Sequence, residues 1–259
     1  MSLTEVKQQL VDCIRMLEQS DIIDYNGHCS IRLDDGHIII NIGSCQRSRL
    51  TVDDICTIDI EANQIDGRDK APLERHLHCG IYRARPEVKA IVHAHPKWST
   101  FLTMVGQRYE PVYAQGSLVH PVPLLDSPNS INNRPMADRL AATLGSRPAA
   151  LMKSHGAVTV GKDLVEAFVL ANYLEENAYR QYMALQIGKP YVFTDEEIAL
   201  CREKLWNENL FKRTWDHFHA KLKYYSSPSL LSIQPSPPVR YRTTPAMRAG
   251  LDAIACRVR

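Results

Sequence analysis

The stretch Ala90-Ile-Val-His-Ala-His-Pro96 couples a short apolar strand to two histidines, and the rest of the chain is interpreted outward from it. Successive side chains of a strand point to opposite faces, so His93 and His95 project from the same face. Pro96 has no backbone N–H and ends the strand ladder directly after them. Two neighbouring imidazoles are half of a transition-metal site, although histidines satisfied by hydrogen bonds alone would give the same pattern.

A turn further along the chain supplies a third imidazole. Residues 149–153 and 157–160 are predicted to be apolar strands, and Ser154-His155-Gly156 joins them. A turn between two strands holds a side chain rigidly and leaves it accessible. His155 with His93 and His95 therefore gives three imidazoles, which is the ligand set of an open catalytic metal site.

An acidic residue precedes the histidine strand on a predicted helix. Residues 72–85 have helical character, and Pro86 closes the segment. Glu74 and His78 are four residues apart and would share one helix face. We interpret His78 as a supporting or core histidine, and Arg75 as either a carboxylate clamp or a surface ion-pair partner.

The remaining periodicity alternates between helix and strand, which indicates an α/β protein. It predicts helices at residues 2–20, 97–105, 136–144, 163–187 and 195–221, and strands at 29–33, 37–42 and 55–60. The end of the chain differs, because its Ser- and Pro-rich composition cannot form a packed core by itself. We expect a folded domain over residues 1–223 and a tail over 224–259, with a possible short helix at 244–257.

Composition excludes several classes of function. The 259 residues carry a formal net charge of +2, which is too small to indicate a nucleic acid or an acidic membrane surface as partner. No apolar run is long enough to span a bilayer, and the N-terminus lacks the apolar region of a signal peptide. Seven cysteines without C-x-x-C spacing are typical of a reducing compartment. We therefore expect a cytoplasmic protein without nucleic-acid or membrane partners.

Glu74, the His93-x-His95 strand and the Ser154-His155-Gly156 turn resemble the class II aldolase/adducin family in order and spacing. The resemblance covers roughly residues 5–220 and implies a catalytic domain with a three-layer α/β/α sandwich and a mostly antiparallel central sheet. It implies a homotetramer with active sites between subunits. It also implies that the three histidines bind a divalent metal, Mn²⁺, Zn²⁺, Fe²⁺ or Co²⁺, with Glu74 as a further ligand or as the acid/base group.

The chain departs from the sugar-phosphate aldolases of that family at the positions that hold phosphate. Those enzymes carry Ser-Ser before the glutamate, where this chain has Pro72-Leu73, and Gly-Asn where it has Gly27-His28. Pro72 and Leu73 offer no side-chain donor, whereas a phosphate cradle needs several. His28, Arg75 and His76 are better matched to a carboxylate.

The patterns Gly27-His28-x-Ser30-x-Arg32 and Pro72-x-Glu74-Arg75 resemble one sub-branch of the family. The sub-branch includes metal-dependent decarboxylases of 3-hydroxy-2-methylpyridine-4,5-dicarboxylate and of 3,4-dihydroxyphthalate. The resemblance implies a carbon–carbon lyase that decarboxylates an ortho-hydroxy aromatic or heteroaromatic carboxylic acid, with the metal as Lewis-acid electron sink. The implied catalytic residues are Glu74, His28 and Arg75.

Three alternatives stay open at this stage. The first is a class II aldolase or epimerase that acts on a ketose phosphate, against which Pro72-Leu73 argues. The second is a metal-dependent oxidative enzyme on hydroxy-aromatic acids, because the sub-branch also contains proteins linked to oxidative cleavage. The third is a non-catalytic interaction module like the adducin head domain, against which the intact glutamate and histidines argue.

Overall fold

The computed structural model describes residues 1–225, with side chains to residue 222, and residues Met1–Tyr224 form one compact unit. Nearly all of the predicted tail at 224–259, including its possible helix, lies outside the described residues. The boundary at residue 223 therefore stays a prediction. Within the described part, every helix is too short or too polar to cross a membrane.

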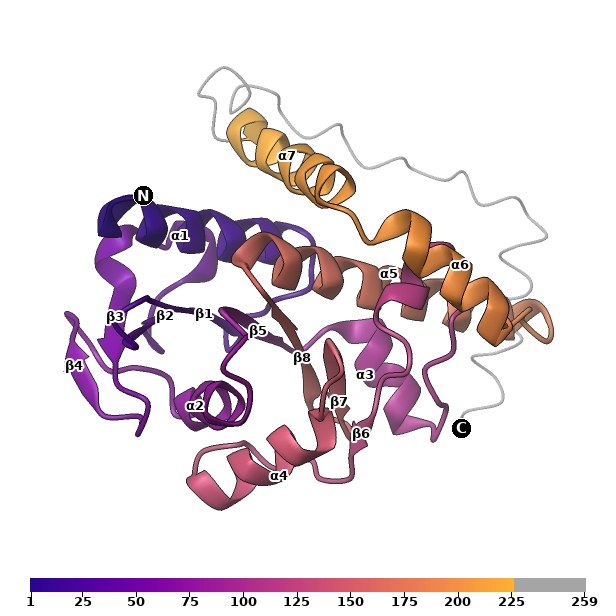
Figure 1. Cartoon of the computed structure of the whole chain (residues 1–259), viewed down its shortest axis with the longest axis horizontal. Coiled ribbons are helices and arrows are strands. Elements are labelled where there is room, and N and C mark those ends of the chain that lie inside the picture. Colours follow the sequence, from indigo (N-terminus) through magenta and orange to yellow (C-terminus); the bar gives the residue numbers. More distant parts are fainter. Residues whose placement is uncertain (226–259) are drawn as a thin grey trace, which may run out of the picture. The chain divides into compact units, whose positions relative to one another are not determined.

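A sheet of eight strands forms the middle layer of the described chain (Figure 1). Its order is β4-β3-β2-β1-β5-β8-β7-β6, so the histidine strand β5 lies in its interior. The strands are β1 (His28–Arg32), β2 (Ile38–Asn41), β3 (Ile55–Ile58), β4 (Gln64–Asp66), β5 (Ala90–Ala94), β6 (Leu124–Leu125), β7 (Ala149–Met152) and β8 (Gly156–Gly161).

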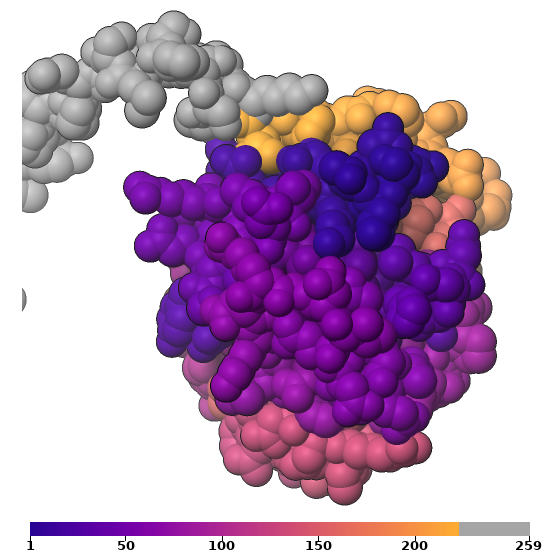
Figure 2. All heavy atoms as spheres, turned by 90° about the vertical axis from the view of Figure 1, so that its left-hand side faces the viewer, coloured from indigo at the N-terminus to yellow at the C-terminus, as the bar shows by residue number. Residues whose placement is uncertain are grey.

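Helices cover both faces of the sheet, which confirms the expected three-layer arrangement. Figure 1 shows α1 and α5 on one face and α2 and α4 on the other. Figure 2 views the molecule from the side of β4, where the indigo and purple N-terminal segments form most of the surface. The helices are α1 (Leu3–Gln19), α2 (Arg75–Ala84), α3 (Lys97–Met104), α4 (Arg134–Leu144), α5 (Leu164–Ile187), α6 (Asp195–Leu205) and α7 (Glu208–Tyr225).

The sheet is mixed and not mostly antiparallel, which corrects the expectation from the sequence. The parallel pairing lies at one edge of the sheet. β6 pairs in parallel with β7, while the other pairings are antiparallel. The physical reason is the connection between these two strands. The chain leaves β6, crosses over through α4 and re-enters the sheet in the same direction, as parallel neighbours require.

Two predicted helices have different bounds in the structure. α2 begins at Arg75 and not at residue 72. Glu74 is its N-cap residue, so the glutamate lies at the N-terminus of the helix. The helix predicted at 195–221 is divided into α6 and α7. The side chain of Asn207 accepts a hydrogen bond from the backbone N–H of Leu210, and this contact starts a new helix where the first one ends.

The alternation of β5 places the histidines on the α2/α4 side of the sheet. Ala90, Val92 and Ala94 belong to the core beneath α1 and α5, whereas Ile91 packs in the core beneath α2 and α4. His93 has the same parity as Ile91 and lies directly opposite His28 of β1 in the antiparallel register. Opposite residues of an antiparallel pair share a face, so the pairing brings these two imidazoles together.

Candidate metal centre

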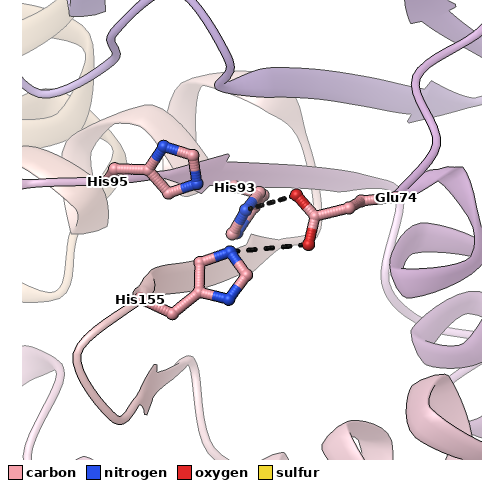
Figure 3. Close-up of side chains that lie close together, drawn as sticks. All are labelled: Glu74, His93, His95 and His155. Carbon is pink, nitrogen blue, oxygen red and sulfur yellow. Dashed lines mark ion pairs between the residues drawn. The ribbon is translucent and has the colours of Figure 1, made fainter. Parts of the chain in front are cut away.

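Four side chains converge where β5, the β7–β8 turn and the start of α2 meet (Figure 3). They are Glu74, His93, His95 and His155, and one ligand atom from each lies within 4.8 Å of all the others. The structure thus brings together the four residues that the sequence analysis selected as ligands. Glu74 and His93 are buried, and His95 and His155 are partly exposed.

Each of the three histidines is oriented by a hydrogen bond that its ring nitrogen Nδ1 donates. When Nδ1 carries the hydrogen, the Nε2 lone pair is available to a metal. In all three rings Nδ1 is the anchored atom: it donates to the carbonyl of Ala157 from His93 (3.0 Å), to the carboxylate of Asp24 from His95 (3.0 Å), and to the carbonyl of Asn129 from His155 (3.2 Å).

Glu74 faces these nitrogens as an ionised carboxylate. Oε2 lies 3.5 Å from Nε2 of His93, and Oε1 lies 3.5 Å from Nε2 of His155. Oε1 also accepts a hydrogen bond of 2.9 Å from the backbone N–H of Ile131. Burial raises the pKa of Glu74, but the ring nitrogens of His28 and His93 outweigh it and hold the pKa well below its usual range.

The donor set fits a divalent metal ion. Nε2 of His93 is fully buried and makes no hydrogen bond among the described residues, which is costly for a polar atom unless something else occupies its lone pair. Three imidazole nitrogens and one carboxylate oxygen are ligands that suit zinc and related first-row metals. The anchored rings would direct their lone pairs at such an ion without rearrangement.

The turn before β1 explains how Asp24 reaches His95. Oδ1 of Asp24 accepts hydrogen bonds from the backbone N–H groups of Asn26 (2.9 Å) and Gly27 (3.1 Å), which closes the turn. Position 27 requires glycine, because a Cβ there would lie 2.0 Å from Cγ1 of Ile23. Burial raises the pKa of Asp24, but these hydrogen bonds and the one from His95 outweigh it, so the pKa is lowered.

The β7–β8 turn holds His155 by a different device. Ser154 has a left-handed backbone with φ of 53°, and its N–H donates to Oγ1 of Thr103 at 2.8 Å. Gly156 allows β8 to pass close to β5, since a Cβ there would lie 2.4 Å from the carbonyl oxygen of Ala94. The strained residue and the tight approach together turn His155 toward the cluster.

His28 lies beside the cluster and leads into a buried chain of hydrogen bonds. Its Nε2 is 3.7 Å from Oε2 of Glu74, and its Nδ1 is 2.7 Å from Nε2 of His78. Nδ1 of His78 lies 2.6 Å from the hydroxyl of Ser30, which is 2.8 Å from the hydroxyl of Tyr82. Burial lowers the pKa of His28 to about 4 and that of His78 well below its usual range, so both rings are neutral.

Arg75 lies outside the cluster, in the wall of a neighbouring pocket of about 590 Å³. Its guanidinium donates to the backbone carbonyls of Ala62 (2.7 Å) and Pro72 (3.2 Å). Within the described part of the chain it has no carboxylate partner. The geometry therefore separates Arg75 from His28 and Glu74, although the three were grouped as catalytic candidates.

Sequence reasoning missed the residues that anchor the ligands. Asp24 had a local signal, because it begins the turn signalled by Asn26-Gly27. Asn129 and Ile131 act through backbone atoms, which leave no trace in side-chain chemistry. Arg47 of the segment between β2 and β3 was also missed, and its buried guanidinium binds the carbonyl of Gly27.

Comparisons with known proteins agree with this architecture. Residues 8–182 match the family model described as Class II Aldolase and Adducin N-terminal domain. The L-fuculose phosphate aldolase of Methanocaldococcus jannaschii is 28% identical over 184 residues, which cover 71% of this chain and 98% of the relative. The 3-oxo-tetronate 4-phosphate decarboxylase of Haemophilus influenzae is 30% identical over 185 residues, which cover 66% of this chain and 83% of the relative.

Solved structures share the fold at lower identity. An aldolase II superfamily protein from Pseudomonas syringae has a TM-score of 0.78 and 20% identity, over 87% of this chain and 96% of that one. An L-fuculose 1-phosphate aldolase has a TM-score of 0.73 and 24% identity, over 79% of this chain and 97% of that one. At this level of identity, the likeness shows the fold.

Proposed function

The chain belongs to the class II aldolase and adducin family, and we propose that it is a metal-dependent lyase that decarboxylates an ortho-hydroxy aromatic or heteroaromatic carboxylic acid. One observation carries the proposal: the predicted ligand cluster is assembled, while Pro72 and Leu73 in the wall of the neighbouring pocket offer no side-chain donor to a phosphate. A relative named as a decarboxylase supports the view that this fold can host the loss of CO₂.

The pocket beside Glu74 is poorly suited to a phosphate. Pro72 and Leu73 form part of its wall without a side-chain donor. Ser44 also lines it, but its hydroxyl donates to the carboxylate of Asp69. That hydrogen bond holds the pKa of Asp69 below its usual value, so its negative charge offsets part of the positive charge that Lys70 and Arg75 bring to the pocket wall.

Decarboxylation of an ortho-hydroxy acid needs an electron sink next to the carboxylate. When the ring carbon that bears the carboxylate takes up a proton, the hydroxyl becomes a ketone and the substrate becomes a β-keto acid. Loss of CO₂ then returns the electron pair to that oxygen and restores the aromatic ring. A divalent metal held by His93, His95, His155 and Glu74 would supply the Lewis acid that polarises this oxygen.

The residues around the cluster have separate tasks in this proposal. Glu74 lies beside the metal ligands, with its oxygens 3.5 Å from Nε2 of His93 and of His155, so it is positioned to pass on a proton close to the reacting carbon. His28 is neutral and fixed by His78, so it contacts the substrate through a hydrogen bond rather than through a charge. Arg75, in the pocket wall, would contact a part of the substrate that is remote from the metal.

The test is a screen for CO₂ release by the metal-loaded protein on hydroxybenzoates, hydroxyphthalates and hydroxypyridine dicarboxylates. We expect release only from acids with a hydroxyl ortho to the carboxylate, with des-hydroxy analogues inert or inhibitory. Equal rates for a des-hydroxy analogue would refute the electron-sink mechanism. Consumption of O₂ in step with substrate would replace the proposal by oxidative cleavage.

A second candidate is aldol cleavage of a ketose phosphate, which the named L-fuculose phosphate aldolases favour. Lys70 in the pocket wall is the cation that a phosphate could use there. We expect dihydroxyacetone phosphate neither to bind well nor to react, because Asp69 and Pro72-Leu73 oppose it. Measurable cleavage of a ketose 1-phosphate would favour this candidate over decarboxylation.

We also propose a homo-oligomer, most simply a tetramer with active sites between subunits. Leu73 is 75% exposed beside the pocket, and Tyr25 is 77% exposed in the turn that positions Asp24. Large apolar side chains next to a site are typical of surfaces that another subunit covers. Light scattering at micromolar concentration should give a multiple of the chain mass, and a monomer mass would contradict the proposal.

A further inference from the structure

Arg47 is a buried cation without a buried anion to match it. Its residue is 3% exposed, and no carboxylate of the described residues lies within ion-pair distance of its guanidinium. Nε donates to the carbonyl of Gly27 at 2.8 Å, and Nη1 donates to the carbonyl of Cys45 at 2.6 Å and to its Sγ at 3.1 Å. Nη2 makes no hydrogen bond with the described chain, and it is not among the buried atoms that solvent cannot reach.

Arg32 and Arg68 use their terminal nitrogens differently from Arg47. Arg32, at the far end of β1, uses its terminal nitrogens on the carbonyls of Tyr82, Arg85, Pro86 and Val88, at 2.6 to 3.0 Å. Arg68 pairs with the buried carboxylate of Asp54 from an exposed position. Taking a charge out of water costs several kcal/mol unless a counter-charge or hydrogen bonds compensate it, and Arg47 leaves part of its donor fork uncompensated.

The position of Arg47 is next to the metal centre. The carbonyl that it holds belongs to Gly27, and the following residue, His28, places its Nε2 3.7 Å from Glu74. The segment that carries Arg47 continues from Gly43 and Ser44, which line the pocket beside Glu74. The positive charge of Arg47 is also among the causes that lower the pKa of His28. The guanidinium therefore lies close to the histidine that faces the cluster.

We propose that Arg47 binds a carboxylate of the substrate and is the specificity-determining cation of this site. The inference rests on the proposed function, which requires a carboxylic acid beside the metal. The two N–H groups of Nη2 remain as charged donors for a carboxylate oxygen. The hydrogen bonds of Nε and Nη1 fix the plane of the guanidinium, and with it the direction of Nη2, before the substrate arrives, so little side-chain entropy is lost on binding.

Binding of inert probes tests the proposal without turnover. Isothermal titration calorimetry of the metal-loaded full chain would use phthalate, benzoate and catechol, the last of which has oxygen donors but no carboxylate. We expect Arg47→Gln to weaken phthalate and benzoate binding about tenfold to a hundredfold, the size of a lost charge-assisted hydrogen bond, and to leave catechol unchanged. Arg47→Lys should recover part of the loss, because it keeps the charge but not the fork.

Arg32→Gln is the matched control, since it removes another carbonyl-bound arginine at the opposite end of β1. It should lower the melting temperature without changing the ratio of phthalate to catechol affinity. Equal weakening of all three probes by Arg47→Gln would assign Arg47 a purely structural role. Unchanged phthalate affinity in Arg47→Gln, or no phthalate binding by the native protein, would also overturn the inference.

The outcome separates this inference from the proposed function. Binding of phthalate that depends on Arg47, together with no CO₂ release from any acid in the screen, would leave the anion site standing and refute the decarboxylase. Release of CO₂, together with a phthalate affinity that Arg47→Gln does not change, would support the decarboxylase and refute the anion site.

Discussion

Two groups of histidines lie on either side of Glu74, and they differ in what their ring nitrogens meet. His93, His95 and His155 each anchor Nδ1 to a backbone carbonyl or a carboxylate and turn Nε2 inward. His28 and His78 instead bond to each other, and His78 continues to Ser30. The number of buried histidines therefore does not identify a metal site; the convergence of three Nε2 atoms whose Nδ1 partners are carbonyl or carboxylate oxygens identifies it.

The first and largest expected effect separates the two groups by metal content. We expect the native protein to carry about one divalent ion per chain and His93→Ala to lose most of it, because the inward Nε2 is removed. His78→Gln is the control, since His78 offers no free lone pair, and it should retain the metal. Elemental analysis of the purified variants measures both. Equal loss of metal from the two variants would erase the distinction between the groups.

Glu74 is common to both groups, and its replacement affects the chemistry more than the metal. Glu74→Gln keeps the three imidazoles but loses the charge that can accept or pass on a proton. We expect the decarboxylation rate to fall at least about a hundredfold, the usual size of a general acid–base contribution, with the metal retained. Steady-state kinetics with parallel elemental analysis tests this. Near-native turnover would remove Glu74 from the proton transfer.

Much of this comparison could be predicted from the sequence, because strand alternation is a strong rule. His93 in β5 and His95 just after its end share a parity, and Ser154-His155-Gly156 was predicted as a turn between two apolar strands. The three layers followed from the family resemblance. The partner of each Nδ1 could not be predicted, since Ala157 and Asn129 act through carbonyls that any residue carries. Helix starts were also uncertain, and Glu74 proved to be an N-cap residue rather than part of a helix face.

The anchoring of His95 gives an effect of intermediate size. Asp24→Asn keeps the turn but weakens the contact with Nδ1 of His95, so the inward lone pair becomes less basic and less well oriented. We expect metal affinity to fall about tenfold to a hundredfold. The matched control is Asp21→Asn, an exposed carboxylate that pairs with Lys97. Competition with a chelator measures the affinities, and equal behaviour of the two variants would argue against an orienting role.

The last comparison concerns stability in acid and tests the paired group. Burial holds the pKa of His28 at about 4 and lowers that of His78, whereas the unfolded chain binds protons near 6.5. The free energy of unfolding of the metal-free protein should therefore fall as the pH drops from 6.5 toward 4, by about 1.4 kcal/mol per unit for each group. Urea unfolding over this range should show a shallower slope for His78→Gln. An identical slope would mean that His78 is not held neutral.

X-ray diffraction at the absorption edge of the bound metal tests the central claim most directly. The account predicts one anomalous peak per chain, at about 2.0 to 2.2 Å from Nε2 of His93, His95 and His155, with Glu74 beside it. A peak at His28 or His78, or metal-loaded crystals without a peak at the three inward nitrogens, would contradict it.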